Sequence, residues 1–227
     1  MSRPASAAGV ARLRRPAFAL LAVLAFASNV ISLSIGSWKD SALPPDAGFS
    51  GTFAGGWQHM LNQPAYFTFM SNFLVGLTSL LLAIRPERRS DLFHAVRIAA
   101  IVCIIITGVV FNLLLRDGPM GTSIEHVNDT VQHIITPVVA PLVWLLLDPR
   151  GAVTWKRIGL SAVIPLGWLA FTLVRGPYLD WYPYSILDVP RMGYGGVAVY
   201  VVAILVFYLS VAALMWVVDR RLARRLP

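Results

Sequence analysis

Six long apolar stretches divide this chain of 227 residues, and they constrain its fold more than any other feature. A bilayer core about 30 Å thick is crossed by roughly 20 residues of helix at about 1.5 Å each, and every stretch is close to or beyond that length. The alternation of period two that a membrane β-barrel requires is absent from these stretches. The sequence therefore predicts an all-α fold with six transmembrane helices, at residues 16–35, 64–84, 92–115, 126–147, 158–174 and 195–218.

The composition of the chain agrees with a polytopic membrane protein. Hydrophobic residues make up 57% of the chain and charged residues 13%, where about 25% charged is usual for soluble domains. These values exclude a soluble globular domain, and the single cysteine, Cys103, excludes a disulfide-rich secreted module. Because no internal repeat and no low-complexity linker separates a second unit, we expect residues 1–227 to form one six-helix domain.

Basic residues lie in short clusters between the apolar stretches, and their placement predicts the orientation of the chain. The basic residues that give the net charge of +8 do not form one continuous stretch, so no nucleic-acid partner is expected. Cytoplasmic loops of membrane proteins are enriched in Lys and Arg. Both ends and two alternate loops carry most of these residues, which predicts cytoplasmic termini: Arg3, Arg12, Arg14, Arg15, Arg85, Arg88, Arg89, Arg97, Arg150, Lys156, Arg157, Arg220, Arg221, Arg224 and Arg225.

Thr68 and His133 are the polar residues within the predicted spans that most suggest chemistry. Ionisable groups at membrane depth are costly and are functional candidates by default. The second and fourth spans would both enter from the outer side, which places Thr68 about 6 Å and His133 about 10 Å below that surface. A neutral imidazole can take a proton from a hydroxyl and return it, so the pair fits a nucleophile and its base. Each also has a structural interpretation, as a hydroxyl bonded to its own helix or as a histidine bonded to a neighbouring helix.

Four further polar residues are expected near this pair. Asp129 lies one helical turn before the histidine on the same face, where it either orients the ring or faces the outer loop. Ser71 and Asn72 continue a polar stripe from Thr68, and interhelical hydrogen bonds are the favoured interpretation for both. Asn112, near the outer end of the third span, either lines the same cavity or joins helices. An uncharged polar side chain that faced the cavity would be able to donate to an oxyanion.

A metal site is a weaker interpretation of the same region. Glu125, Asp129 and His133 fall at helical spacing and would share one side of the fourth span. Neither an HExxH pattern nor a cysteine ligand accompanies them, and such residues often cap the start of a helix. We therefore expect no metal and no other cofactor.

Three short motifs carry a family resemblance. The run YFTFMSN at 66–72, the run HIITP at 133–137 and the loop WYPYSILD at 181–188 resemble the androgen-induced protein family, in particular its bacterial, Pr6Pr-type branch. Animal members are six-span hydrolases of fatty acid esters of hydroxy fatty acids. They use a threonine on the second helix and a histidine on the fourth, so the resemblance implies Thr68 and His133 as catalytic residues and a bacterial inner membrane as the location. The spacing across 128–137 departs from the animal pattern, and His126 matches no family residue.

These observations lead to two functional hypotheses. In the first, the protein is an integral-membrane lipid ester hydrolase with a Thr68 nucleophile and a His133 base near the outer leaflet, and its partners are membrane lipids and a lipid ester substrate. In the second, the same polar residues serve a non-enzymatic transporter or lipid-binding protein. The absence of an internal repeat weakens the transporter interpretation, because many transporters are built from two related halves.

Overall fold

The computed structural model describes residues 5–116 and 121–224, which fold almost entirely as helices. Helices account for 79% of the structure, and the described residues include no strand. The prediction of an all-α fold is confirmed. Six helical runs are long and apolar enough to cross a membrane: Arg12–Gly36, Phe67–Ile84, Asp91–Leu115, Ser123–Leu147, Trp155–Leu179 and Val189–Ala223.

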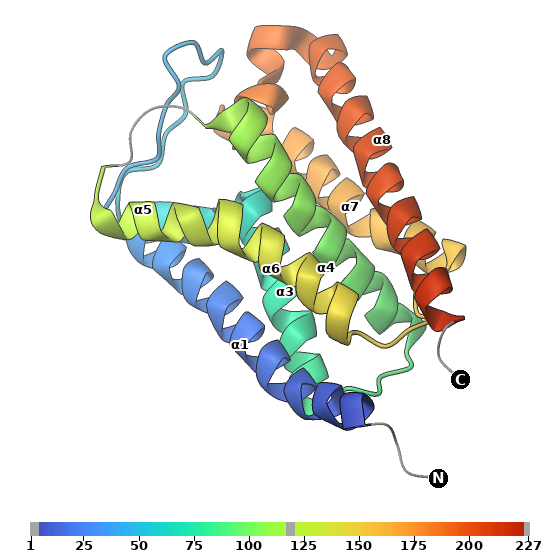
Figure 1. The fold of residues 1–227 in the computed structure, drawn as a ribbon. Helices are drawn as coiled ribbons and strands as arrows, with labels where there is room; N and C mark the ends of the chain where they lie inside the picture. Colours follow the sequence, from blue (N-terminus) through green and yellow to red (C-terminus); the bar gives the residue numbers. More distant parts are fainter. Residues whose placement is uncertain (1–4, 117–120, 225–227) are drawn as a thin grey trace.

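The described residues form eight α-helices and four short helical segments (Figure 1). The α-helices are α1 (Ala5–Gly36), α2 (Trp57–Asn62), α3 (Phe67–Ile84), α4 (Asp91–Val110), α5 (Ser123–Thr130), α6 (Thr136–Leu147), α7 (Trp155–Leu179) and α8 (Val189–Ala223). The short segments are η1 (Gln63–Ala65), η2 (Phe111–Leu115), η3 (Val131–Ile135) and η4 (Ser185–Leu187). Of these elements, α2, η1 and η4 lie outside the six runs. Since η2 and η3 are π-helical, the third and fourth membrane-length runs each contain a wider turn.

α7 and α8 extend beyond the apolar stretches that predict them. α7 is longer at both ends than 158–174, and α8 is longer at both ends than 195–218. The Thr154 hydroxyl caps the start of α7, Asp180 ends it in a left-handed conformation, and the Asp188 carboxylate caps the start of α8. The caps of α7 prolong that helix into a region that hydropathy does not mark. In α8, the non-helical Gly193 (φ 67°, ψ 167°) separates the turn that Asp188 caps from the rest of the helix.

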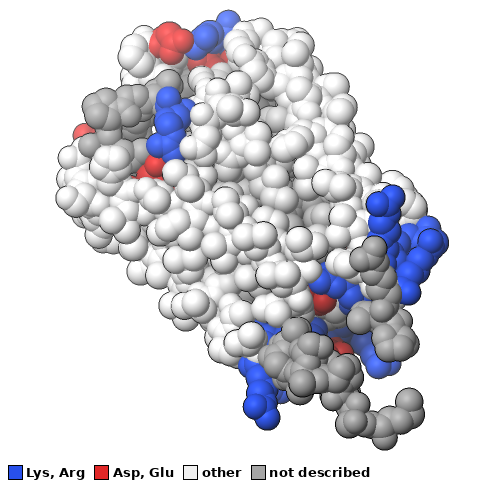
Figure 2. Space-filling model, in the orientation of Figure 1, with Lys and Arg blue, Asp and Glu red and all other residues white. Residues whose placement is uncertain are grey.

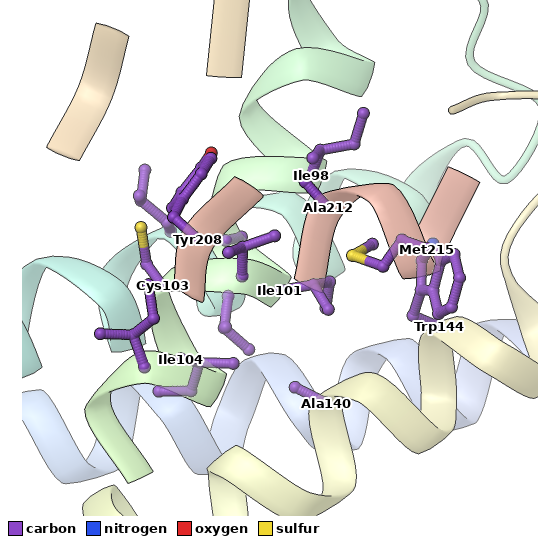
Figure 3. Close-up of a cluster of buried hydrophobic side chains, with 14 of the residues drawn as sticks. Ile98, Ile101, Cys103, Ile104, Ala140, Trp144, Tyr208, Ala212 and Met215 are labelled. Carbon is purple, nitrogen blue, oxygen red and sulfur yellow. The ribbon is translucent and has the colours of Figure 1, made fainter. Parts of the chain in front are cut away.

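α4 is the central helix of the bundle, and its middle is completely buried. It packs against α3, α6, α7 and α8. Figure 3 shows Ile101 of α4 with Ala140 and Trp144 of α6 and Ala212 and Met215 of α8 around it. α7 and α8 both pack on α4 but make few direct contacts with each other. The core is therefore organised around α4, and α7 and α8 pack on its side as separate peripheral helices.

Charged side chains gather at the two ends of the molecule. The described start of α1 and the end of α8 lie at the same end (Figure 1), and most of the Lys and Arg visible in Figure 2 lie there. The opposite end holds acidic and a few basic residues, and uncharged residues cover the wide band between them on the face shown (Figure 2). Arg3 and Arg225, which the orientation prediction uses, lie outside the described residues.

Arg97 differs from the other basic residues of that end, because its side chain is buried. Only 2% of the residue is exposed. Its guanidinium makes two hydrogen bonds to the Asp148 carboxylate, at 2.9 and 3.0 Å, and donates to the hydroxyls of Thr78 and Ser79. A buried charge requires such partners, because an unpaired ion in a low-dielectric interior is very costly.

At the opposite end, two loops join into one unit, residues 37–56 and 180–188, that we call the outer cap after the side of the membrane on which the sequence predicts it. The Asp188 carboxylate accepts from the backbone N–H of Gly48 at 2.7 Å, and the Asp180 carbonyl accepts from that of Gly51 at 2.7 Å. The Ser50 hydroxyl and N–H both donate to the Asp180 carboxylate and hold its pKa below the ordinary value. Aromatic rings of the two loops also pack together, namely Phe49 on Tyr182 and Phe53 on Trp181.

Candidate active site

Thr68 lies in the first turn of α3, near the outer cap. Tyr66 has an extended backbone and α3 begins at the next residue, so the N–H of Thr68 is one of the four that a helix start leaves without an intrahelical partner. This N–H donates to the hydroxyl of Tyr184, at 3.3 Å. The start of α3 thus presents both a hydroxyl and a backbone donor at one place.

His133 lies in the π-helical η3, and the sequence explains part of this local geometry. Pro137 has no N–H to donate to the carbonyl of His133 four residues earlier. The side chain of Asn112 donates to that carbonyl instead, at 2.8 Å. π-helical turns of this kind are frequent at functional sites, because they re-aim a side chain without ending the helix.

The structure brings Thr68 and His133 together, as the sequence predicts. Thr68 Oγ1 lies 3.3 Å from His133 Nε2, and His133 Nδ1 lies 2.6 Å from Asp129 Oδ1. An ionised carboxylate only accepts hydrogen bonds, so the Nδ1 of a neutral His133 ring carries the proton and donates to Asp129. The lone pair of Nε2 then points to the Thr68 hydroxyl. This is the protonation pattern that a general base needs.

Arg116 and Phe111 complete the surroundings of His133. The guanidinium of Arg116 lies 3.2 Å from the second Asp129 oxygen and also donates to Asn112. The ring of Phe111 stacks on the imidazole, with 3.4 Å between centroids and 7° between planes. The Asp129 side chain is only 8% exposed and that of Arg116 is 37% exposed, so this ion pair leads from the buried site toward the surface.

Tyr184 is a site residue that the sequence reading missed. Its hydroxyl lies 3.4 Å from Thr68 Oγ1, and its ring packs against those of Tyr66 and Trp168. Burial raises the pKa of this hydroxyl, so it stays protonated and able to donate. Aromatic residues beside a membrane-length helix are typical of a membrane-interface belt, so the signal for a role in the site is the position of Tyr184 within the 181–188 motif.

An apolar pocket begins at Thr68 and Tyr184 and continues along α4 between α7 and α8. Its cavity volume is about 100 Å³, and the pocket is partly open to the surface. Phe67, Phe111 and Trp168 lie near the site, and aliphatic side chains of α4, α7 and α8 line the remainder. The Thr68 hydroxyl therefore lies between two regions: the hydrogen-bonded side chains of His133 and Asp129, and an apolar space suited to hydrocarbon.

Ser71, Asn72 and Asn112 are near the pair, but their donors point elsewhere. Ser71 donates to a carbonyl of its own helix and shares a 2.7 Å hydrogen bond with Thr107 of α4, which is the interhelical role that the sequence favours. Asn72 donates to the carbonyl of Thr68 at 3.0 Å. Asn112 joins helices, as described above, and none of the three lines the pocket.

Glu125 also lies apart from the Asp129, His133 and Thr68 side chains. Its carboxylate pairs with Lys39 and completes a capping box with Thr122 at the start of α5. Within the described ranges, no three His, Cys, Asp or Glu side chains are grouped so that they could hold a metal ion. The arrangement of Glu125, Asp129 and His133 thus gives no support to the alternative metal interpretation.

Comparisons with known proteins do not place the chain in a family. No protein-family model matches it, and no curated protein and no solved structure matches it either. The resemblance to androgen-induced proteins therefore continues to depend on the three motifs, and the site must be judged on its own geometry.

Proposed function

We propose that the protein is an integral-membrane hydrolase of lipid acyl esters, in which Thr68 is the nucleophile and His133 the general base. The observation that carries the proposal is the continuous set of contacts from Asp129 through His133 to Thr68, at the end of an apolar pocket. A nucleophile, a base and a group that orients the base form the arrangement by which hydroxyl nucleophiles are activated on unrelated folds.

In the proposed reaction, His133 Nε2 takes the proton of Thr68 as Oγ1 attacks the ester carbonyl carbon. The resulting tetrahedral intermediate collapses when the ester C–O bond breaks, and His133 gives its proton to the leaving alcohol oxygen. Water then loses a proton to His133 and attacks the acyl group, which leaves as a carboxylic acid while Thr68 regains its proton. Asp129 holds the ring in the tautomer that both halves of the reaction need.

Tyr184 is the proposed donor to the oxyanion of this intermediate. Its hydroxyl accepts from the Thr68 N–H and lies 3.4 Å from Thr68 Oγ1, so its proton can turn from Oγ1 to the ester carbonyl oxygen when Oγ1 attacks. A single oxyanion donor is typically worth about 3–4 kcal/mol in the transition state. The sequence assigns this role to Ser71, Asn72 or Asn112, and the directions of their hydrogen bonds favour Tyr184 instead.

The proposal includes the membrane and the orientation of the chain. Both termini would lie in the cytoplasm, with the outer cap and the site on the other side, in a bacterial inner membrane. The gathering of Lys and Arg at the end where α1 begins supports this orientation (Figure 2). Lipid binding without catalysis is the second candidate, because the apolar pocket would suit it equally well.

Hydrolysis assays on single and double variants test the proposal. Thr68→Ala and His133→Ala should each lower ester hydrolysis by at least about 10³-fold in detergent, and the double variant should be little worse than either, because the two residues act as a unit. A fluorophosphonate probe should label the wild-type protein but not Thr68→Ala.

Thr130→Ala is the matched control, since that hydroxyl donates to the carbonyl of His126 in its own helix. It should hydrolyse and label like the wild type. Wild-type turnover by folded Thr68→Ala protein would refute the nucleophile, and lipid binding without any turnover by the wild-type protein would favour the second candidate.

A further inference from the structure

One end of the pocket is polar and the rest of its lining is apolar. Almost all of its polar side chains are already hydrogen-bonded to other protein groups. The indole N–H of Trp168 donates to the carbonyl of Ala65, and the hydroxyl of Thr107 is bonded to Ser71. Tyr208, at the far end, is bonded to Ser161 at 2.7 Å. Thr68 and Tyr184 therefore offer the reactive polar atoms at one end, and the rest of the space has no comparable partner for a polar ligand group.

We call this remainder the acyl slot, lined chiefly by Ala162, Leu166 and Leu169 of α7 and Val201, Leu205 and Tyr208 of α8. Each set spans eight residues of helix, so the slot is about 10 Å long. Burying a polar group without a partner costs about 1–3 kcal/mol in proteins, whereas burying each methylene is favourable. The slot is thus suited to a stretch of unsubstituted alkyl chain.

The outer cap covers the end of the bundle from which water would approach. Its two loops are joined by the Gly48 and Gly51 hydrogen bonds to Asp188 and Asp180, and its aromatic rings pack in a buried cluster that includes Ile186 and Leu187. These two residues also line the pocket. A ligand from the aqueous side would have to separate this packed unit.

The side of the slot is less closed. α7 and α8 make few direct contacts with each other, although both pack on α4. Leu166, which lines the slot, is 45% exposed, and Leu205 is partly exposed. In a protein whose helices cross a bilayer, the space beside two such helices is filled by lipid tails.

We propose that the acyl slot receives the hydrocarbon chain of a bilayer lipid ester, which enters sideways between α7 and α8. This inference rests on the proposed esterase function and adds to it the route of entry and the direction of binding. The chain lies between the two helices and points from Thr68 toward Tyr208, and the ester stands at Thr68 beneath the outer cap. Substrates with a polar substituent on this part of the chain are poor ones.

Leu205→Trp tests the slot, with Val206→Trp as the matched control on the neighbouring, 58% exposed position. In phosphatidylcholine vesicles, Leu205→Trp should hydrolyse p-nitrophenyl palmitate at least about tenfold more slowly than the wild type, because the indole takes the volume of several methylenes. The ratio of palmitate to p-nitrophenyl acetate hydrolysis should fall at least about fivefold, because the acetate has no chain that the indole could displace. Val206→Trp should resemble the wild type on both esters, and equal palmitate hydrolysis by Leu205→Trp would overturn the inference.

A photolabelling experiment tests whether the acyl slot binds a fatty acid chain, independently of ester hydrolysis. Thr68→Ala protein in the same vesicles is irradiated with a fatty acid that carries a diazirine in mid-chain, and the modified peptides are mapped by mass spectrometry. Labels on 162–169 and 201–208, reduced by excess palmitate and by Leu205→Trp, are expected. Labels confined to the outer cap would overturn sideways entry. If the wild-type protein hydrolyses no ester but these labels appear, the esterase proposal fails and the acyl site stands.

Discussion

At the scale of single residues, the site depends on backbone groups that have no hydrogen-bond partner within their own helix. Pro137 cannot donate to the carbonyl of His133, and Asn112 does so instead. The first turn of α3 leaves the N–H of Thr68 for Tyr184. In both places an ordinary helical hydrogen bond is replaced by a tertiary one, which ties the reactive side chains to other helices.

Asp129→Asn tests the orienting role of the carboxylate. An amide in this place can donate to Nδ1 and so shift the ring proton to Nε2, where it blocks proton transfer from Thr68. We expect kcat to fall by about 10²- to 10⁴-fold with KM little changed, because the pocket itself is untouched. Steady-state kinetics with a lipid ester measures both quantities, and an unchanged kcat would contradict the role.

At the scale of elements, a close approach of α4 and α6 sets the place of His133. A Cβ on Gly108 of α4 would lie 2.6 Å from the Cβ of Pro137 and 3.5 Å from the carbonyl oxygen of His133. Only a residue without a side chain permits this approach. Gly176 has the same role in α7, where an added Cβ would lie 2.2 Å from the ring of Tyr182 in the outer cap.

Gly108→Ala should therefore destabilise the protein and impair the site together. Overpacking of this kind typically costs about 1–3 kcal/mol, and the displaced α6 would move His133 away from Thr68. Thermal unfolding in detergent and ester hydrolysis are the measurements. Gly167→Ala on α7 is the matched control, since its Cβ would meet nothing within 4 Å, and it should be neutral or stabilising by up to about 1 kcal/mol. Equal behaviour of the two variants would argue against the close approach.

At the scale of the whole molecule, charge gathers at the two ends on the face that Figure 2 shows. The Arg97 and Asp148 pair is buried. The pair joins α4 to the end of α6, and its hydroxyl partners Thr78 and Ser79 belong to α3. Three helices are thereby held together at the end where α1 begins, far along the bundle from the site.

Removing one member of this pair should be worse than removing both. Arg97→Leu and Asp148→Leu should each cost about 3–5 kcal/mol, because the remaining charge is buried without its partner, and the double variant should recover much of that loss. Thermal unfolding in detergent gives the comparison. As a control, Lys156→Ala removes an exposed partner of Asp91 and should leave the unfolding temperature unchanged. Additive losses in the double variant would mean that the pair is not coupled.

The sequence by itself determined the helical class and the six membrane-length runs, because length and apolarity are local properties of each stretch. It also predicted that Thr68 and His133 would meet, since the depth of a residue follows from residue numbers. It left Asp129 either beside the ring or facing the outer loop. Their proximity is observed, and their catalytic roles stay predictions.

Only the tertiary structure decided that Arg116 and Tyr184 join the site, that Arg97 is buried, and that the pocket lies between α7 and α8. A helix that is apolar on all sides carries no periodic pattern to indicate its rotation about its own axis, and lipid solvates each face equally well. Which side chains face one another then depends on how whole helices pack, and that information belongs to pairs of helices distant in the chain.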